Sequence, residues 1–110
     1  MTENNGIPIG NMAEYTDSIN PLSLTAIVDG VGVDSCMVQV VSNSGVFSNT
    51  RQLARFRVDG GVAAANSGMY LGETDIYIFR KGELKKNVSI IPLAASDVSA
   101  KIIYQYYKTQ

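Results

Sequence analysis

The sequence predicts an all-β fold, namely a single antiparallel β-sandwich or jelly-roll-like barrel of about seven to eight short strands with an extended N-terminal arm. Three observations predict it. Short runs rich in β-branched and aromatic residues alternate between apolar and polar positions. Clusters of Gly, Asn, Asp and Ser separate these runs at intervals of about 8–12 residues. No helical pattern alternates with the strands, as it would in a parallel α/β fold.

The chain has 110 residues, the size of one domain. We expect residues 1–20 to form an N-terminal arm and loop, and residues 21–110 to form the β-sandwich domain. The first six residues are polar, and the Ile7-Pro8-Ile9 piece is extended because proline biases its neighbour away from the helical region.

Residues 11–19 leave a second interpretation open. Asn11 followed by Glu14 resembles a helix capping box, and Met12, Tyr15 and Ile19 fit a helical stripe. One short helical turn is therefore an alternative to a loop here.

The strands follow in order along the remainder of the chain. Pro21 opens the first, and the turn clusters at 29–32, 43–45, 59–61 and 66–68 divide the next ones. Lys81-Gly82 forms the turn of a hairpin that organises the second half. Strands are expected over residues 22–28, 33–42, 52–58, 69–71, 75–80, 87–93 and 98–108, with a short edge piece at 46–47.

Alternation within each strand assigns its residues to two faces. In 33–42 it places Val38 and Val40 opposite to Met37 and Gln39. In 52–58 it predicts an inward face of Ala54, Phe56 and Val58, and an outward face of Leu53, Arg55 and Arg57. The inward residues expected to anchor the core on three strands are Phe56, Ile78 and Ile102.

Several kinds of chemistry lack their residues. The chain has no histidine, so a Ser–His–Asp or Cys–His catalytic arrangement is impossible and the commonest metal ligand is missing. Its one cysteine, Cys36, lies in an apolar run and is expected to be an ordinary buried thiol. We therefore expect a protein that is not an enzyme, with no cofactor, no metal and no small-molecule substrate.

The charge pattern argues against two classes of partner. The net charge is −1, which provides no basic field for nucleic acid. No apolar stretch approaches the ~18 residues of a membrane helix, and the polar N-terminus does not read as a signal peptide. We expect synthesis in a cytoplasm. Charged residues make up 17% of the chain, below the ~25% of an average soluble protein, so neutral surface is available for protein partners.

Three features are candidates for partner binding. Ile7, Pro8 and Ile9 could add as a strand to the sheet edge of a neighbour. Arg55 and Arg57 present guanidinium forks that suit carboxylates. The last strand is apolar on both faces, with Tyr104 and Tyr106 on one and Ile103 and Tyr107 on the other, so it is either central or covered by another chain.

In overall character, the arm MTENNGIPIG, the glycine-rich hairpin turns and the tyrosine-rich last strand resemble the small decoration, cement or staple proteins that clamp the outer capsid of tailed phages, especially short-tailed enterobacterial phages. This resemblance implies a β-sandwich or jelly-roll clip, a dimer or trimer, and the major capsid protein as partner. It implies a location on the virion capsid surface after synthesis in the host cytoplasm. No family motif matches residue by residue, so no residue role is carried over.

The alternative is a carbohydrate- or receptor-binding β-module of a phage tail or spike. Sugar sites commonly use aromatic platforms, and the chain has no tryptophan. Tyr70, Tyr77 and Tyr107 would have to serve.

Overall fold

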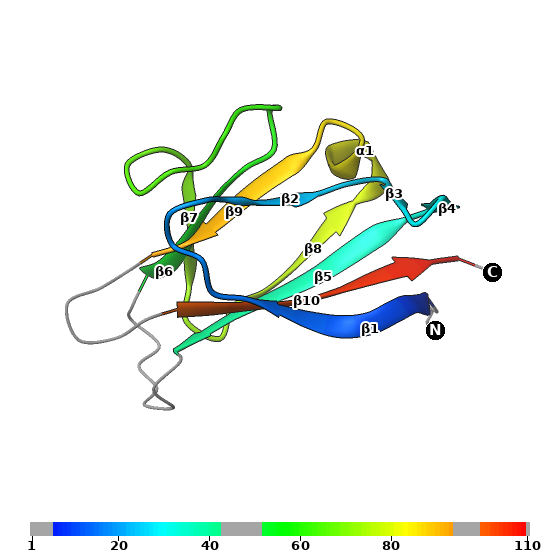
Figure 1. Cartoon of the computed structure of the whole chain (residues 1–110), viewed down its shortest axis with the longest axis horizontal. Helices are drawn as coiled ribbons and strands as arrows, with labels where there is room; N and C mark the ends of the chain where they lie inside the picture. The colour runs from blue at the N-terminus through cyan, green and yellow to red at the C-terminus, as the bar shows by residue number, and fades with distance from the viewer. Residues whose placement is uncertain (1–5, 43–51, 94–99, 110) are drawn as a thin grey trace.

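The computed structural model describes residues 6–42, 52–93 and 100–109, and within these ranges the protein is an all-β chain of antiparallel sheets (Figure 1). Two sheets have four strands each. The first sheet has the order β1-β10-β5-β8, with β1 at Ile7–Tyr15, β10 at Ala100–Lys108, β5 at Ser35–Ser42 and β8 at Ile76–Arg80. The second sheet has the order β2-β9-β6-β7, with β2 at Leu22–Leu24, β9 at Val88–Pro92, β6 at Gln52–Arg57 and β7 at Met69–Gly72.

Two small elements complete the described chain. A short hairpin joins β3 (Ile27–Val28) and β4 (Val31–Gly32), with Asp29 and Gly30 at positive φ in its turn. One helical turn, α1 (Lys81–Leu84), connects β8 to β9. The expected hairpin turn at Lys81-Gly82 is therefore a helical connection, and the two strands that it joins lie in different sheets.

The strand pairs are nested along the chain. β1 pairs with β10, β2 with β9, β5 with β8 and β6 with β7, all antiparallel. The outermost pair brings residues close to the two ends of the chain together, since Ile7 lies opposite Lys108. Figure 1 shows the start of β1 and the end of β10 at the same end of the molecule.

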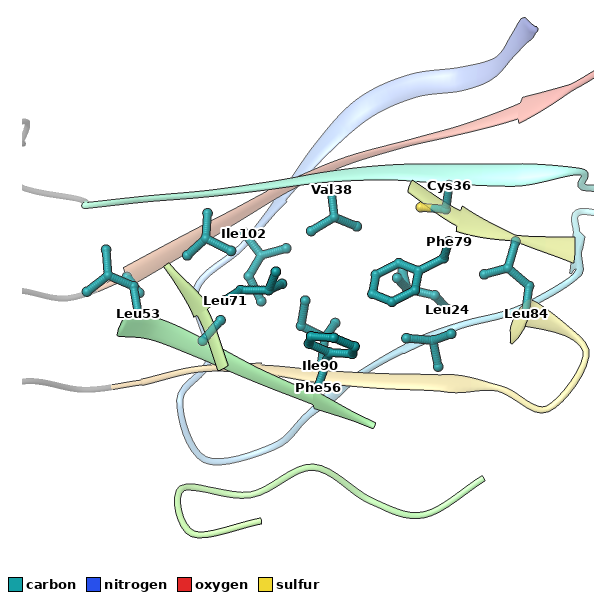
Figure 2. Close-up of a cluster of buried hydrophobic side chains, with 14 of the residues drawn as sticks. Leu24, Cys36, Val38, Leu53, Phe56, Leu71, Phe79, Leu84, Ile90 and Ile102 are labelled. Carbon is teal, nitrogen blue, oxygen red and sulfur yellow. The ribbon is translucent and has the colours of Figure 1, made fainter. Parts of the chain in front are cut away.

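The hydrophobic core draws on both sheets (Figure 2). Phe56 from the second sheet meets Tyr77 and Phe79 from the first, with ring centroids 5.3 and 5.4 Å away. Aliphatic side chains surround these rings, and those fully buried include Leu24, Leu53, Leu84, Ile90 and Ile102. The predicted burial of Phe56 and Ile102 is confirmed.

The predicted burial of Ile78 is wrong. Ile78 is 40% exposed, whereas its neighbour Phe79 is 0% exposed. The pairing register explains the reversal, because Phe79 lies opposite the buried Cys36 and therefore shares its face. The alternation of this strand was predicted correctly, but its inward face was inverted.

Leu53 is a second correction. It was expected to face outward, yet Leu53 is 1% exposed and Ala54 beside it is 0% exposed. The register of β6 against β7 shifts between Gln52 and Ala54, as in a β-bulge, which lets two consecutive side chains enter the core.

The N-terminal arm and loop predicted for residues 1–20 contain a strand of the first sheet. Ile7–Tyr15 forms β1, so the alternative of a helical turn around Asn11 and Met12 is also wrong. The expected strand over 22–28 is divided into β2 and β3. The expected edge piece at 46–47 lies outside the described residues.

Candidate interaction face

The outer side of the first sheet is the candidate functional site. The cross-strand register aligns its outward residues in rows across β10, β5 and β8. Those rows are Ile103–Gln39–Ile76, then Gln105–Met37–Ile78, then Tyr107–Ser35–Arg80.

Five of the nine residues in these rows are apolar or aromatic, namely Ile103, Ile76, Met37, Ile78 and Tyr107. Ile76 is 61% exposed, Met37 37%, and Met12, which β1 adds, 64%. Here the outer apolar face means six residues: Met12, Met37, Ile76, Ile78, Ile103 and Tyr107. A hollow of about 140 Å³ lies on it, lined by Met12, Met37, Gln39, Ile76, Ile103, Tyr104, Gln105 and Tyr107.

Met12 reaches this hollow from an irregular part of β1. The pairing of β1 with β10 shifts register between Ile9 and Ala13, and Gly10 has φ +71°. The Gln105 side chain bridges the shift, because its Nε2 donates to the carbonyl oxygens of Ile9 at 3.1 Å and of Gly10 at 3.2 Å. A glycine in the interior of a strand often marks such a bulge.

A second hollow, of about 400 Å³, adjoins the first through Tyr107. It is lined by Gly6, Asp34, Ser35, Arg80, Tyr107, Lys108 and Thr109. Asp34 accepts hydrogen bonds from the backbone N–H and Oγ1 of Thr109 at 2.7 and 2.9 Å, which lowers the pKa of its carboxyl group. Lys81 Nζ lies 3.7 Å from the same carboxylate. No ion pair among the described residues engages Arg80 or Lys108.

Four of the residues predicted to bind a partner meet at this end of the first sheet. Ile7, Pro8 and Ile9 pair with Lys108, Tyr107 and Tyr106. Gly6 packs against the Tyr107 ring, since a Cβ on Gly6 would lie 2.9 Å from Tyr107 Cβ. The three N-terminal residues thus complete their own sheet, and Tyr107 forms the wall between the two hollows.

Arg55 lies in the second sheet, away from these four. Its Nε and Nη2 both donate to the carbonyl oxygen of Gly68, at 2.9 and 2.6 Å, and its Nη1 donates to Ala65 O and Tyr70 Oη at 3.2 Å each. The guanidinium also lies over the Tyr70 ring, 4.3 Å from its centroid. Arg55 therefore holds the loop that follows β6 against the sheet.

Arg57 serves the same loop. Its Nε and Nη2 form a fork on the Asp59 carboxylate at 3.0 and 2.7 Å, and its Nη1 donates to Ser67 Oγ at 3.1 Å. The hydrogen bonds from Arg57, with another from the Gly61 N–H, lower the pKa of Asp59 to about 2. Both guanidinium groups form hydrogen bonds within the chain, and partner binding by Arg55 and Arg57 stays a prediction.

The tyrosines of the carbohydrate-binding alternative do not form one platform. Tyr77 packs in the core, with its ring centroid 4.5 Å from that of Phe79. Tyr70 belongs to β7 of the second sheet, whereas Tyr107 belongs to β10 of the first.

Cys36 is a free, buried cysteine. Burial raises the pKa of this thiol to about 12, and its side chain belongs to the core, as expected of a packing residue. Within residues 6–42, 52–93 and 100–109, no three side chains of Cys, Asp and Glu gather into a group that could hold a metal ion. No helix in these ranges has the length and apolarity required to cross a bilayer.

Comparisons of the chain with protein-family models, with curated proteins and with solved structures gave no match.

Proposed function

We propose that this protein is a non-catalytic structural protein that binds and stabilises the capsid shell of a tailed phage as a decoration or staple protein. Its partner in this proposal is the major capsid protein, and its location is the capsid surface of the virion after synthesis in the host cytoplasm. The observation that carries the proposal is the outer apolar face. Contiguous exposed apolar side chains on a folded domain are typical of protein interfaces.

We infer that the fold is a β-sandwich of the jelly-roll kind. The nested strand pairs support this, because they correspond to one long antiparallel ribbon wound into two four-stranded sheets. Jelly rolls occur in viral capsid proteins and in lectins, so the fold agrees with the capsid role but does not select it over sugar binding.

The dimensions of the face favour binding in many copies. Three spacings of about 4.8 Å between its four strands and four residue steps of about 3.4 Å between its end rows give a backbone area of roughly 200 Å². A standard protein interface buries about 800 Å² on each partner. One copy would therefore bind weakly, whereas a dimer or trimer that contacts a repetitive shell gains avidity.

The test is co-sedimentation of the purified protein with capsid particles that lack their decoration protein. Ile76→Glu places a charge in the outer apolar face and should abolish co-sedimentation. Ile27→Glu is the matched control, because both are strand isoleucines of similar exposure, 61% for Ile76 and 67% for Ile27, but Ile27 lies in the β3–β4 hairpin. Equal binding by the two variants, or no binding by the wild type, contradicts the proposal.

Two further measurements complete the test. Light scattering of the purified protein should give a dimer or trimer. A glycan array should give no selective binding, and selective sugar binding by a protein that ignores the particles would favour the tail or spike module instead.

A further inference from the structure

The outer apolar face and the hollow beside it differ in chemistry. The first hollow is lined mainly by apolar residues, and Gln39 and Gln105 are its non-aromatic polar lining residues. The second presents Arg80 and Lys108. Because Tyr107 lines both, a single ligand can reach from one to the other.

The carboxylates near the second hollow are already engaged. Asp34 accepts two hydrogen bonds from Thr109 and lies 3.7 Å from Lys81 Nζ. Glu83 accepts a hydrogen bond from the backbone N–H of Arg80 at 2.9 Å. Asp34 lines this hollow and keeps its negative charge, which the nearby Lys81 ammonium offsets. The other charged lining residues, Arg80 and Lys108, are cationic and suit a carboxylate.

The volume of the first hollow limits the size of the apolar group that can bind in it. Its volume of about 140 Å³ is below the roughly 300–1,000 Å³ of small-molecule sites. It suits an apolar side chain of a protein rather than a complete small ligand.

The spacing of the two hollows fits an extended chain. Met37 lines the first and Ser35 the second, two residues apart on β5, while Ile76 and Arg80 are four residues apart on β8. At about 3.3 Å per residue these separations are about 7 and 13 Å. An extended segment covers the same distance with two to four residues of its own.

We propose that the outer face of the first sheet binds an extended segment of its protein partner. An apolar side chain of this segment enters the first hollow. An acidic side chain two to four residues away pairs with Arg80 and Lys108. This inference rests on the proposed function, since it specifies the partner chemistry of the same face. The acidic side chain is inferred because its negative charge complements Arg80 and Lys108 at the second hollow.

The probe is a pair of synthetic peptides, acetylated and amidated. One has the sequence Ser-Leu-Ser-Leu-Ser-Glu-Ser, and the other has Lys in place of Glu. Titration into ¹⁵N-labelled protein at low salt should shift the amide signals of Met37, Ile76 and Arg80 with the Glu peptide. The Lys peptide should bind at least about fivefold more weakly, because it loses one ion pair and adds repulsion.

Charge reversal on the protein should reverse this preference. Arg80→Glu should bind the Lys peptide better than the Glu peptide, and Lys108→Glu provides a second variant that leaves the connection to α1 untouched. Lys86→Glu is the matched control, because Lys86 is exposed and absent from the lining of both hollows. Melting curves verify that each variant is folded.

Three results overturn the inference. The first two are equal binding of both peptides and changes in amide signals that are confined to another surface. The third is a dimer in sedimentation velocity that Ile76→Glu dissociates, because a second copy of the chain would then occupy the face. The two proposals fail separately. Loss of particle binding in Ile76→Glu without any peptide preference would overturn only this inference. The reversed peptide preference without particle binding would overturn only the capsid role.

Discussion

Phe79 and Ile78 are neighbours in the chain with opposite environments. Phe79 packs in the core, where its ring meets Phe56 and Tyr77. Ile78 belongs to the outer apolar face. The aromatic ring therefore stabilises the fold, whereas the isoleucine belongs to the face that we propose binds a partner.

Replacing these two residues separately should give very different stabilities. Phe79→Ala should lower the free energy of unfolding by about 3–5 kcal/mol, because it leaves a cavity among packed rings. Ile78→Ala should lower it by less than about 1 kcal/mol, because the side chain is already partly in solvent. Urea denaturation followed by circular dichroism measures both, and equal losses would contradict the inward face assigned to β8.

Asp59 should make stability depend on pH in the acid range. Its pKa in the folded state is about 2, below the ordinary value of 3.8, because of hydrogen bonds from Arg57 and Gly61. A lowered pKa means that the folded state favours the ionised carboxylate, so this stabilisation is present above about pH 4 and is lost as the pH falls toward 2.

The measurement is the melting temperature of the wild type and of Asp59→Asn between pH 2 and pH 7. The wild type should melt at the higher temperature at neutral pH, and the difference should shrink as the pH falls from about 4 toward 2. A difference that does not change with pH would show that the carboxylate charge has no role.

At the scale of elements, β1 supports the strand beside it. Ile9 packs against the core, and the backbone of β1 pairs with β10 at the edge of the first sheet. The strand also pairs Pro8 with Tyr107 and carries Met12 to the outer face, and Gly6 just before it packs against Tyr107. The N-terminal segment thus belongs to both the fold and the candidate site.

Deletion of residues 1–9 should therefore destabilise the protein, whereas a free arm would be dispensable. We expect the free energy of unfolding to fall by about 1–3 kcal/mol, because Ile9 loses its burial and part of β10 loses its partner. Ile9→Ala should reproduce much of this loss, and the exposed Pro8 should tolerate Ala within about 0.5 kcal/mol. An unchanged urea midpoint for the deletion variant would indicate that residues 1–9 form an arm that is dispensable for stability.

The loop after β6 depends on a glycine where it returns to the sheet. Gly68 has φ +127°, and a Cβ at this position would lie 2.9 Å from the carbonyl oxygen of Phe56. Its own carbonyl oxygen accepts two of the four hydrogen bonds that Arg55 donates. The backbone can approach this closely only because the residue has no side chain.

Gly68→Ala should lower the free energy of unfolding by about 1–3 kcal/mol through backbone strain. Gly32→Ala is the matched control, because a Cβ there would meet no atom within 4 Å. It should change stability by no more than about 0.5 kcal/mol. Urea titrations of the two variants measure these stabilities. A Gly68 variant as stable as the control would contradict the close approach of Gly68 to the backbone of Phe56.

At the scale of the whole molecule, the two sheets share one core. Strands distant in sequence are adjacent, since β1 pairs with β10 and β2 with β9. Cys36 lies within that core on β5, whose neighbours on both sides are other strands. A reagent can therefore reach the thiol only when the sheets separate.

Cys36 should thus report unfolding of the complete domain. A thiol reagent such as dithiobis(nitrobenzoate) should not react with the native protein, both because the side chain is buried and because burial raises the thiol pKa to about 12. The urea dependence of labelling should coincide with the loss of the β signal in circular dichroism. Rapid labelling without denaturant would indicate local opening of β5.

Local alternation determined a large part of this protein. The sequence by itself predicted the all-β class, the position of most described strands, the two faces of β5 and the burial of Phe56 and Ile102. These properties follow from the period of two in an extended backbone, which is present in every short stretch of chain.

Tertiary structure alone decided which of two apolar faces turns inward. Along β8, isoleucines and aromatic rings are both hydrophobic, so hydrophobicity does not choose between them. The choice follows from the register with β5, which places Tyr77 and Phe79 on the side of Val38 and Cys36. That register depends on residues about forty positions away, and a shift by one residue would exchange the faces.

The candidate site depends on the same long-range pairing. Met12, Ile103, Met37 and Ile76 come from four strands, and only the sheet order β1-β10-β5-β8 brings them to one face. The arginine partners are also set by the fold, because the carbonyl of Gly68 reaches Arg55 only when β7 pairs with β6. Spacing along the chain determines the face of a residue within its strand, but the neighbours of that face are determined by packing of the whole chain.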